Sequence, residues 1–526
     1  MLRRFITLLV AGTTGLALSA MAQQGAGSAT PPATFNVLEY VVEGNSVLPQ
    51  IEIERAIYRH MGENKSFADI EKARTALEKT YQDAGFLTVL VDIPEQQVKG
   101  GVVTLRVIEG RVERLRVTGS RYYALGEIKS RTPELAEGSV PYFPDVQKQL
   151  AQLNRNDDRR VTPVLKAGTT PGKVEIDLTV EDRLPVHGDV ELNDRASANT
   201  TALRLTGTLR YENLWQKDHS LAFTFLTSPE ERSQVELFSG TYVIPGIWGE
   251  NALAFYGVQS KSNVAAVGTL SVIGNTNIAG VRYIMPMPPA EGLSHSLTLG
   301  LDYKVSKDSV NLLQGGTAET PLSYAPLSLQ YGRTRQDLNG TTQFNLGSDI
   351  GLRNVLGNYD GEFANKRFNA SASFMTIKGG LSRLQSLGSG WWLSGSVDGQ
   401  LASGPLISNE QYGAGGADTV RGYFESEVLG DVGARGSMEL RRFLPSGGGA
   451  VKEAYVFGYL EGAVAHIFDA LPGQQASFNI SSAGLGLRLK AWRGLRFWLD
   501  FGQAFKATQY TPKNAVRTLF RLGYEF

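Results

Sequence analysis

The segment Leu495-Arg496-Phe497-Trp498-Leu499-Asp500-Phe501 decides the fold, because leucine or phenylalanine occupies every second position and charged residues lie between them. Successive side chains of a β-strand point to opposite faces, so one face of this segment suits lipid and the other carries charge. Residues 203–211 and 297–304 repeat the pattern. Runs of about ten residues with this alternation indicate transmembrane strands, because the strands of a soluble sandwich are mostly shorter.

We count sixteen such runs between Val186 and Phe526. An even number of antiparallel strands closed into a barrel leaves no free edge and no unpaired backbone group within a bilayer. The 59 glycines and the hydrophobic content of 42% suit a barrel better than a helical membrane protein. Residues 184–526 are therefore predicted to form an all-β transmembrane barrel of 16 antiparallel strands.

The composition argues against several other classes of protein. Lysine plus arginine equals aspartate plus glutamate, at 52 each, so no basic excess is present to attract a nucleic acid. Without cysteine the chain forms neither a disulfide nor a thiolate metal site. The five histidines have no ligand spacing, and no Gly-x-Ser-x-Gly motif occurs. We therefore expect no metal, no cofactor and no enzymatic activity.

Residues 1–22 have the three parts of a secretory signal peptide. Arg3 and Arg4 are followed by an apolar run from Phe5 to Leu18 and by the small-residue end Ala20-Met21-Ala22. The apolar run is shorter than the ~20 residues that a membrane-spanning helix needs. Residues 23–34 are a mixture of small residues and proline without periodicity, which predicts a linker.

Residues 35–109 and 110–183 are predicted to form two α+β units with the same strand-helix-helix-strand-strand order. The helices are expected at residues 49–60, 67–83, 124–131 and 144–154. A repeated order of this kind indicates two copies of one small domain in tandem.

Residues 404–430 form a long glycine-rich segment that interrupts the strands and contains Val420-Arg421-Gly422-Tyr423. A loop of this length within a regular β pattern is usually functional or disordered, and the apolar and aromatic residues in it argue against disorder. On residue type alone, Arg421 is a solvated loop charge.

The tetrapeptide Val420-Arg421-Gly422-Tyr423 resembles the signature of outer-membrane transporters that combine polypeptide-transport-associated (POTRA) domains with a barrel. The turns at residues 42–45 and 117–120 occupy equivalent places in the two small units and resemble those of POTRA domains. Two such units before sixteen strands, with residues 192–195 and 213–216 at the barrel start, are similar to one family in particular. This is the haemolysin secretion and activation family (ShlB/FhaC/HecB), the TpsB transporters of two-partner secretion.

The resemblance implies POTRA domains at 35–109 and 110–183 in the periplasm, a barrel at 184–526 in the outer membrane of a Gram-negative bacterium, and a loop at 404–430 folded into the lumen. The implied function is export of a large β-helical exoprotein, of haemolysin or adhesin type, without nucleotide hydrolysis. The POTRA domains would bind this client and the barrel would form the pore.

The implied partners are the exoprotein, the barrel assembly machinery and outer-membrane lipid, with the transporter itself a monomer. The terminal aromatic residues Tyr524 and Phe526 resemble the signal by which outer-membrane barrels are recognised for assembly. Well-studied relatives also carry an amino-terminal helix that plugs the lumen. Residues 23–34 have neither the length nor the periodicity for such a helix.

In that family the loop arginine reaches an acidic residue within an aromatic-x-Asp-x-Gly motif on the second strand after the loop. The corresponding stretch here is Tyr459-Leu-Glu461-Gly462, in which glutamate replaces aspartate and the glycine is displaced by one position. A closer literal match, Trp498-Leu-Asp500-Phe-Gly502, lies two strands further on. Strand order favours Glu461 as the partner of Arg421, with Asp500 as the alternative.

Two other functions are compatible with parts of the sequence. A factor that inserts other barrels into the membrane shares the Val-Arg-Gly-Tyr loop, but its close relatives usually carry more than two POTRA domains. A passive porin explains the barrel but gives residues 35–183 no purpose.

Overall fold

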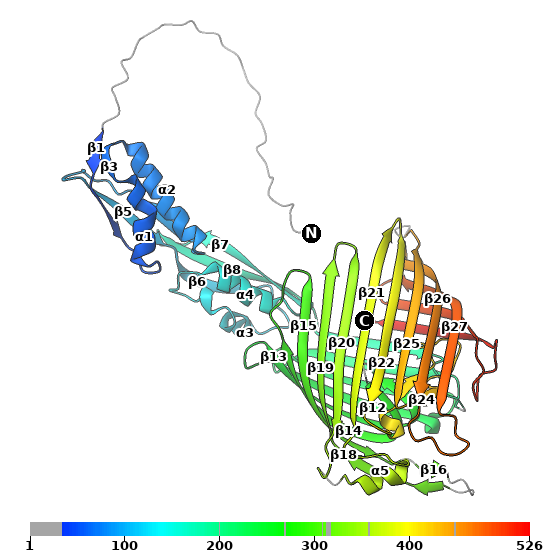
Figure 1. Ribbon diagram of the computed structural model, residues 1–526. Coiled ribbons are helices and arrows are strands. Elements are labelled where there is room, and N and C mark those ends of the chain that lie inside the picture. Colours follow the sequence, from blue (N-terminus) through cyan, green and yellow to red (C-terminus); the bar gives the residue numbers. More distant parts are fainter. Residues whose placement is uncertain are drawn as a thin grey trace, which may run out of the picture. The chain divides into compact units, whose positions relative to one another are not determined.

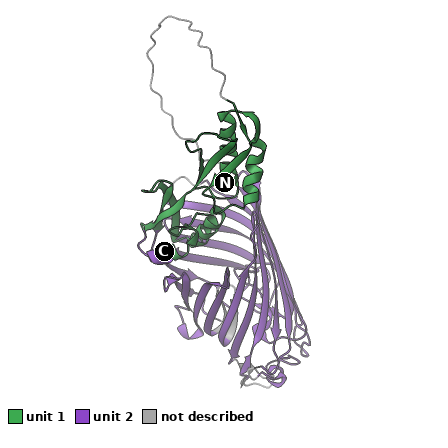
Figure 2. Cartoon of the chain, turned by 90° about the vertical axis from the view of Figure 1, so that its left-hand side faces the viewer, with its two compact units in different colours: residues 1–119, 128–181 green, residues 120–127, 182–526 purple. Residues whose placement is uncertain are grey.

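The computed structural model describes residues 34–526 apart from 199, 268–269, 308, 312–316, 356–357 and 446–448. The predicted signal peptide and nearly all of the predicted linker lie outside the described residues. The chain divides into two compact units, residues 1–119 with 128–181 and residues 120–127 with 182–526 (Figure 2). In the described part of the chain, no helix is both long and apolar enough to span a bilayer.

The unit made of residues 1–119 and 128–181 is called the periplasmic unit, after the location that the resemblance implies. Its first half contains a three-stranded sheet with two helices. The strand order is β2 (Glu39–Glu43), β5 (Val102–Glu109) and β4 (Val89–Asp92), and β2 runs parallel to β5. Helices α1 (Gln50–Ile57) and α2 (Phe67–Asp83) follow β2. The buried side chains of α2 recur every three or four residues and lie in one core with those of the sheet; they are Ile70, Ala73, Leu77 and Tyr81.

Two short strands, β1 (Phe35–Val37) and β3 (Gly62–Lys65), pair outside this sheet. The predicted order has one strand before the first helix and none between the two helices, whereas the structure has β1 and β2 before α1 and places β3 between α1 and α2. A 3₁₀-helix at Tyr58–His60 ends α1, and the chain then returns beside its own start.

The second half repeats the pattern with the sheet order β6 (Arg111–Thr118), β8 (Lys173–Asp182) and β7 (Arg159–Ala167). Its helices are α3 (Leu125–Ser130) and α4 (Phe143–Leu153), and a 3₁₀-helix lies at Pro133–Leu135. The Phe143 amide donates to the Gly85 carbonyl at 3.0 Å, and the ring centroids of Phe86 and Tyr142 lie 5.4 Å apart. The two halves therefore pack directly on each other.

The second unit is a closed antiparallel barrel, which confirms the predicted fold class (Figure 1). In the described part of the chain its sixteen wall strands are β9 (Val186–Asn193), β10 (Arg204–Leu214), β11 (His219–Thr227), β12 (Val235–Ile247), β13 (Asn251–Val267), β14 (Leu270–Pro286), β15 (Leu293–Ser306), β18 with β19 (Leu322–Tyr324 and Pro326–Asp337), β20 (Gly340–Gly351), β21 (Met375–Gly388), β22 (Trp391–Ala402), β25 (Val432–Phe443), β26 (Val451–His466), β27 (Ser477–Ala491), β28 (Leu495–Ala504) and β29 (Val516–Glu525). Strands β18 and β19 both pair with β15, so together they form one wall strand.

The alternation seen in the sequence becomes the two faces of the wall. In β28, Phe501 is 47% exposed on the outside, whereas the neighbouring Asp500 is 5% exposed on the lumen side. The barrel begins at β9, and the short turns between strands lie at the same end of the wall as Val186. We call this the periplasmic end, because the resemblance places residues 35–183 in the periplasm. The long loops lie at the opposite end, here called extracellular, and one of them contains α5 (Asp360–Lys366).

The segment 404–430, predicted to be a loop, contains a 3₁₀-helix at Ser408–Glu410 and a ladder of β23 (Tyr412–Ala414) with β24 (Val428–Gly430). Other short elements at the extracellular end are the 3₁₀-helix Arg232–Gln234 and the hairpin of β16 (Ser309–Asn311) with β17 (Thr317–Glu319).

Candidate functional site

We call residues 404–430 the lumen loop, because they contact the inner face of the barrel wall. The Tyr412 hydroxyl donates to Asp398 of β22 at 2.8 Å, and three further contacts each involve several residues. The first contact is with β14 and β15. The Lys304 ammonium lies 2.7 Å from Glu410, whose side chain is 2% exposed, and the Tyr324 hydroxyl donates to the same carboxylate at 2.6 Å. Asn409 donates to the Thr276 hydroxyl at 3.2 Å. The start of the loop is therefore fixed to one side of the lumen.

The second contact is centred on Arg421, whose side chain is 3% exposed. Its Nε and Nη2 donate to Glu461 Oε1 at 3.0 and 2.5 Å, and its backbone amide donates to Glu461 Oε2 at 2.8 Å. Nη2 also donates to Glu439 at 2.6 Å, and Nη1 lies 3.5 Å from Asp500. The structure brings Arg421 to both carboxylates that the sequence left open, and to a third.

Two aromatic rings pack against the guanidinium group of Arg421. Its carbon lies 3.6 Å from the ring centroid of Tyr459 and 5.3 Å from that of Phe457. A cation over an aromatic face is attracted by the ring, more strongly where water is excluded. The Tyr459 hydroxyl donates to the Phe501 carbonyl at 3.1 Å, which fixes the ring position.

Charges around Arg421 balance. Arg441 donates to Glu439 at 2.9 and 2.6 Å, and Arg488 donates to Asp500 through two bonds of 2.9 Å each. The cluster thus contains three guanidinium groups, on Arg421, Arg441 and Arg488, and three carboxylates, on Glu439, Glu461 and Asp500. Buried charges are tolerated when they are paired and hydrogen-bonded in this way.

Two glycines allow the loop backbone to approach the wall. Gly422 has a φ of +102°, and a Cβ there would lie 3.3 Å from the Gly502 carbonyl oxygen. A Cβ on Gly502 would lie 2.9 Å from the Gly422 nitrogen. Beside the predicted Gly462, the atom nearest to a Cβ would be the Ile480 oxygen of β27, at 3.6 Å, and not an atom of the loop. The contact glycine belongs instead to the literal motif on β28.

Val420 and Tyr423, on either side of Arg421 and Gly422, are fully buried. The Tyr423 hydroxyl donates to the carbonyls of Ser481 and Lys506, at 3.1 and 2.9 Å. All four residues of the predicted tetrapeptide therefore pack against strands β26 to β28 or the loop that follows β28.

The third contact joins the loop to the first and last strands, and the sequence analysis did not identify it. Arg195, which follows β9, lies 2.7 Å from Asp418 and 3.0 Å from Glu425. The Glu425 amide donates to the Ala196 carbonyl at 3.1 Å, and Arg521 of β29 lies 3.8 Å from Asp418. A cavity of about 470 Å³ with charges of both signs remains between the loop and this part of the wall.

Asp431 joins three extracellular loops just beyond the lumen loop. Its fully buried carboxylate accepts two bonds from Arg367, one of them at 2.7 Å. It also accepts bonds from the amides of Leu406 and Phe468, at 2.9 and 2.7 Å, and from Gln411 at 3.0 Å. We call Asp431 with Arg367 the cap pair. No motif in the sequence indicated it.

The carboxyl terminus closes the barrel seam. Phe526 and Gly188 exchange backbone hydrogen bonds of 2.9 and 3.0 Å, and the Phe526 ring covers Gly188 so closely that a Cβ there would lie 2.0 Å from it. The rings of Tyr524 and Phe526 are stacked with centroids 6.3 Å apart. Both side chains remain exposed, at 48% and 60%, on the outer face.

In the periplasmic unit, one turn is fixed by a carboxylate. Glu113 of β6 accepts bonds from the Thr170 hydroxyl and amide, at 2.7 and 3.1 Å, and from the Thr169 hydroxyl at 2.9 Å. These bonds stabilise the charged form and lower the pKa of Glu113 to about 2.

The architecture is a unit of two small α+β domains followed by a closed antiparallel barrel with a loop in its lumen. The profile of ShlB-type POTRA domains matches residues 35–110, and that of the haemolysin secretion/activation protein ShlB/FhaC/HecB matches residues 172–488. The second match covers more than half of the chain. The chain therefore belongs to the ShlB/FhaC/HecB family of two-partner secretion transporters, which confirms the resemblance and the outer-membrane location predicted from the sequence.

Curated relatives are named as transporters. The outer membrane transporter CdiB of Dickeya dadantii (strain 3937) is 24% identical over 371 residues, which cover 68% of this chain and 64% of that protein. CdiB of Escherichia coli O6:K15:H31 is 25% identical over 202 residues, or 38% of this chain and 33% of that protein. The matched regions thus span less than two thirds of these relatives.

Solved structures share the fold. CdiB from Escherichia coli has a TM-score of 0.65 at 19% identity, covering 96% of this chain and 93% of that one. CdiB from Acinetobacter baumannii has a TM-score of 0.58 at 14% identity, covering 94% and 90%. BamA from Haemophilus ducreyi lacking POTRA domains 1-3 has a TM-score of 0.57 at 14% identity, covering 94% and 100%.

Proposed function

We propose that this chain exports a large β-helical exoprotein from the periplasm to the cell surface through the barrel, and that the lumen loop controls the passage. The observation that carries the proposal is the buried contact of Arg421 with Glu461, Glu439 and Asp500. A passive porin needs no loop fixed at several places across its lumen.

The ion pairs that hold the loop differ in their exposure to water. The side chains of Arg421 and Glu461 are 3% and 4% exposed, so truncating either leaves a buried charge without its partner. At the third contact the Arg195–Asp418 pair is open to water, since Asp418 is 59% exposed, and exposed pairs are worth about 0–1 kcal/mol. The Arg195–Glu425 pair is only 21% and 15% exposed, so a client would have to displace this pair as well to move the loop from that side.

Client capture is assigned to the periplasmic unit, and edge strand β7 is its best candidate surface. Val161 N–H and C=O already bond to the Asn154 side chain at 2.7 and 3.0 Å. Because backbone groups alternate between the two edges of a strand, Pro163 and Leu165 follow Val161 on that same edge. If β7 is regular, Leu165 points its N–H and C=O toward this edge, beside a side chain that is 41% exposed. An extended client segment would add to the sheet there.

Insertion of other barrels is the rival function, and the BamA-like fold keeps it open as an alternative. The two functions predict different effects of removing this protein from a cell. Loss of an exporter would deplete one surface exoprotein, whereas loss of an insertion factor would deplete many outer-membrane barrels. Export needs no nucleotide in this proposal, since the client would be driven by its own folding outside the cell.

The test is an export assay in a strain that lacks the chromosomal copy, with a candidate large β-helical exoprotein expressed as the client. Deletion of residues 35–183 should leave an inserted barrel that exports nothing. Unchanged export by this truncation would refute the receptor assignment. Normal export combined with loss of other outer-membrane barrels on depletion would favour the insertion factor.

A further inference from the structure

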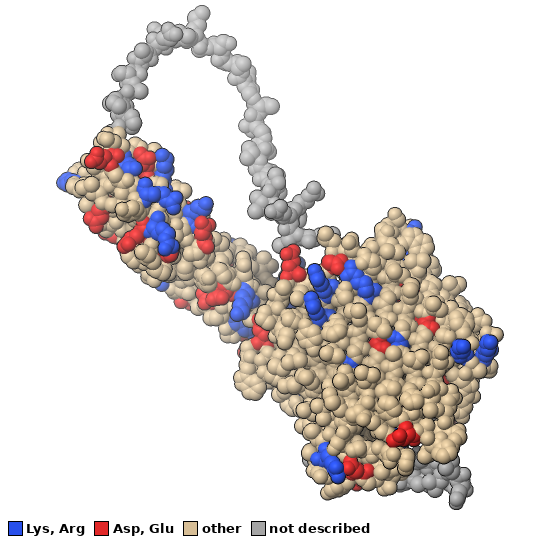
Figure 3. All heavy atoms as spheres, in the orientation of Figure 1, with Lys and Arg blue, Asp and Glu red and all other residues tan. Residues whose placement is uncertain are grey.

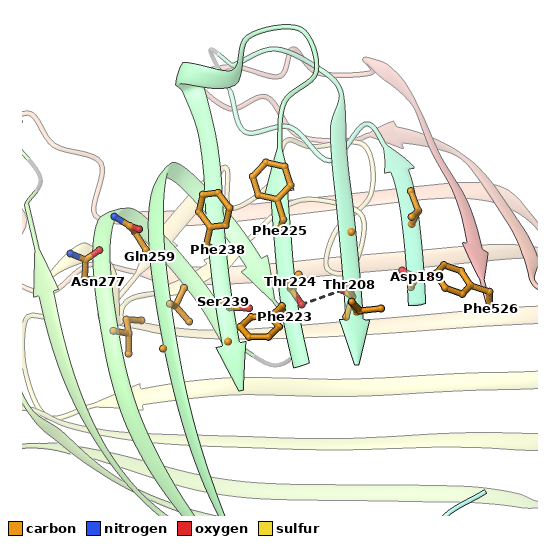
Figure 4. A pocket seen from close by; sticks show the side chains of 17 residues that line it. Asp189, Thr208, Phe223, Thr224, Phe225, Phe238, Ser239, Gln259, Asn277 and Phe526 are labelled. Atoms are coloured by element: carbon orange, nitrogen blue, oxygen red, sulfur yellow. Dashed lines mark hydrogen bonds between the residues drawn. The ribbon is translucent and has the colours of Figure 1, made fainter. Parts of the chain in front are cut away.

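Two hollows on the outer face of the barrel differ in the charge of their lining residues. The first spans β9 to β14, has a volume of about 880 Å³ and is lined by Phe223, Phe225 and Phe238 (Figure 4). Its only charged lining residue is Asp189. The second spans β22 to β28, has a volume of about 800 Å³, and its only charged lining residue is Arg442.

The second hollow forms because a glycine lies between two large outward-facing side chains. Gly458 lies on the outward-facing side of β26 between Val456 and Leu460, which are 42% and 57% exposed. A Cβ on Gly458 would have Leu485 as its nearest neighbour, at 3.6 Å, so the space above Gly458 is empty. Met438 and Leu440 on β25 form one side. The surface is therefore an apolar recess in the region that contacts acyl chains.

Arg442 stands at the periplasmic end of this recess. It occupies the outward position after Met438 and Leu440, and its guanidinium carbon lies 5.2 Å from the ring centroid of its cross-strand neighbour Trp391. The guanidinium donates to the Ser389 carbonyl in the adjacent turn. No carboxylate of the described residues forms an ion pair with it, whereas the outward-facing Arg383 is paired with Asp337 at 2.6 Å.

Most of the barrel face in Figure 3 is uncharged, and its basic and acidic side chains lie mainly toward the edges of that face. An unneutralised guanidinium beside lipid needs an anion, and at the periplasmic leaflet the available anions are phospholipid phosphates. A guanidinium binds phosphate through two parallel N–H donors. A headgroup amine would have no carboxylate partner here, so a net anionic lipid fits better than a zwitterionic one.

We propose that Arg442, Trp391 and the recess around Gly458 bind one anionic glycerophospholipid of the periplasmic leaflet. Its phosphate lies on Arg442 and an acyl chain fills the recess. The site would fix the depth of strands β25 and β26, which carry Glu439 and Glu461 on their other face.

The test uses the full-length protein in detergent and counts retained lipids by native mass spectrometry. The probes are phosphatidylglycerol, phosphatidylethanolamine with the same acyl chains, and glycerol phosphate as a source of phosphate without acyl chains. We expect one tightly retained phosphatidylglycerol, and we expect Arg442→Gln to weaken its retention about tenfold, as for loss of a charge-assisted hydrogen bond. Gly458→Leu should weaken retention as well, by filling the recess.

The matched control is Arg333→Gln, because Arg333 also faces outward near the periplasmic end but lines neither hollow. It should retain the lipid as the parent does. Equal retention by Arg442→Gln and the parent, an equal loss with Arg333→Gln, or equal retention of phosphatidylethanolamine would overturn the proposal. Binding of glycerol phosphate as tight as that of the lipid would do so too, since the recess would then contribute nothing.

Discussion

Breaking the cap pair should open the extracellular end of the barrel. Arg367 donates to Asp431 and also to the carbonyls of Leu406 and Phe468, so one guanidinium connects three loops. In Arg367→Ala these loops lose their common partner, while the strands of the wall remain paired. We expect the barrel to fold and the closed arrangement of its loops to be populated less.

The structure sets the size of the effect. Asp431 is fully buried, and removal of one partner from a buried pair costs about 3–5 kcal/mol. The carboxylate keeps three neutral donors, from Leu406, Gln411 and Phe468, which places the cost at the lower end. A cost of about 3 kcal/mol corresponds to a rise of about a hundredfold in the ratio of open to closed loops.

Single-channel recording in planar bilayers measures this ratio as the fraction of time spent in conducting states. Arg353→Ala is the control, since its pair with Asp360 lies in the same loop but is 56% and 37% exposed. Such a pair is worth about 0–1 kcal/mol, so conduction should change less than about fivefold. If Arg367→Ala conducts like the parent, or if both variants change equally, the cap pair does not hold the pore closed.

Three further outcomes concern the periplasmic unit. Gly85→Ala should destabilise the periplasmic unit. The φ of +98° costs a residue with a side chain about 1–2 kcal/mol, and a Cβ 2.8 Å from Pro144 adds about 1–3 kcal/mol of overpacking. Calorimetry measures the change, and an unchanged Tm would refute the close packing. Leu165→Pro should weaken client binding in a pull-down about three- to tenfold by removing one edge hydrogen bond; unchanged binding would exclude this edge. Because the pKa of Glu113 is lowered to about 2, its contribution to stability is present above pH ~4.5 and is lost as pH falls through ~2. In Glu113→Gln, the free energy of urea unfolding should therefore change less with pH over that range. The same pH dependence in parent and variant would contradict this.

The barrel was predictable because its signal is local. A strand with one face in lipid keeps a period of two over its whole length, as in residues 495–501, and this pattern does not depend on any neighbour. The split of one wall strand into β18 and β19 was not predictable, since the interruption at Ala325 follows from pairing with β15. The β1–β3 pair was missed for the same reason, because each strand is short and its partner is distant.

The site was only partly predictable. Strand order alone directed Arg421 toward β26, and Glu461 lies there, but which carboxylates share one guanidinium depends on the register of β25, β26 and β28. Gly462 was named as the motif glycine, yet Gly502 is the one in contact with the loop. The cap pair joins residues 64 positions apart in sequence, and nothing in the local pattern around either one distinguishes it.

The central claim is that Arg421 holds the lumen loop in the position that export requires. The most direct measurement compares client secretion by the parent, Arg421→Ala and Glu461→Ala, with barrel assembly checked by heat-modifiable mobility. We predict that both variants assemble and that secretion falls at least tenfold in each. Assembly with undiminished secretion by Arg421→Ala would contradict the claim and leave Arg421 as an ordinary loop charge.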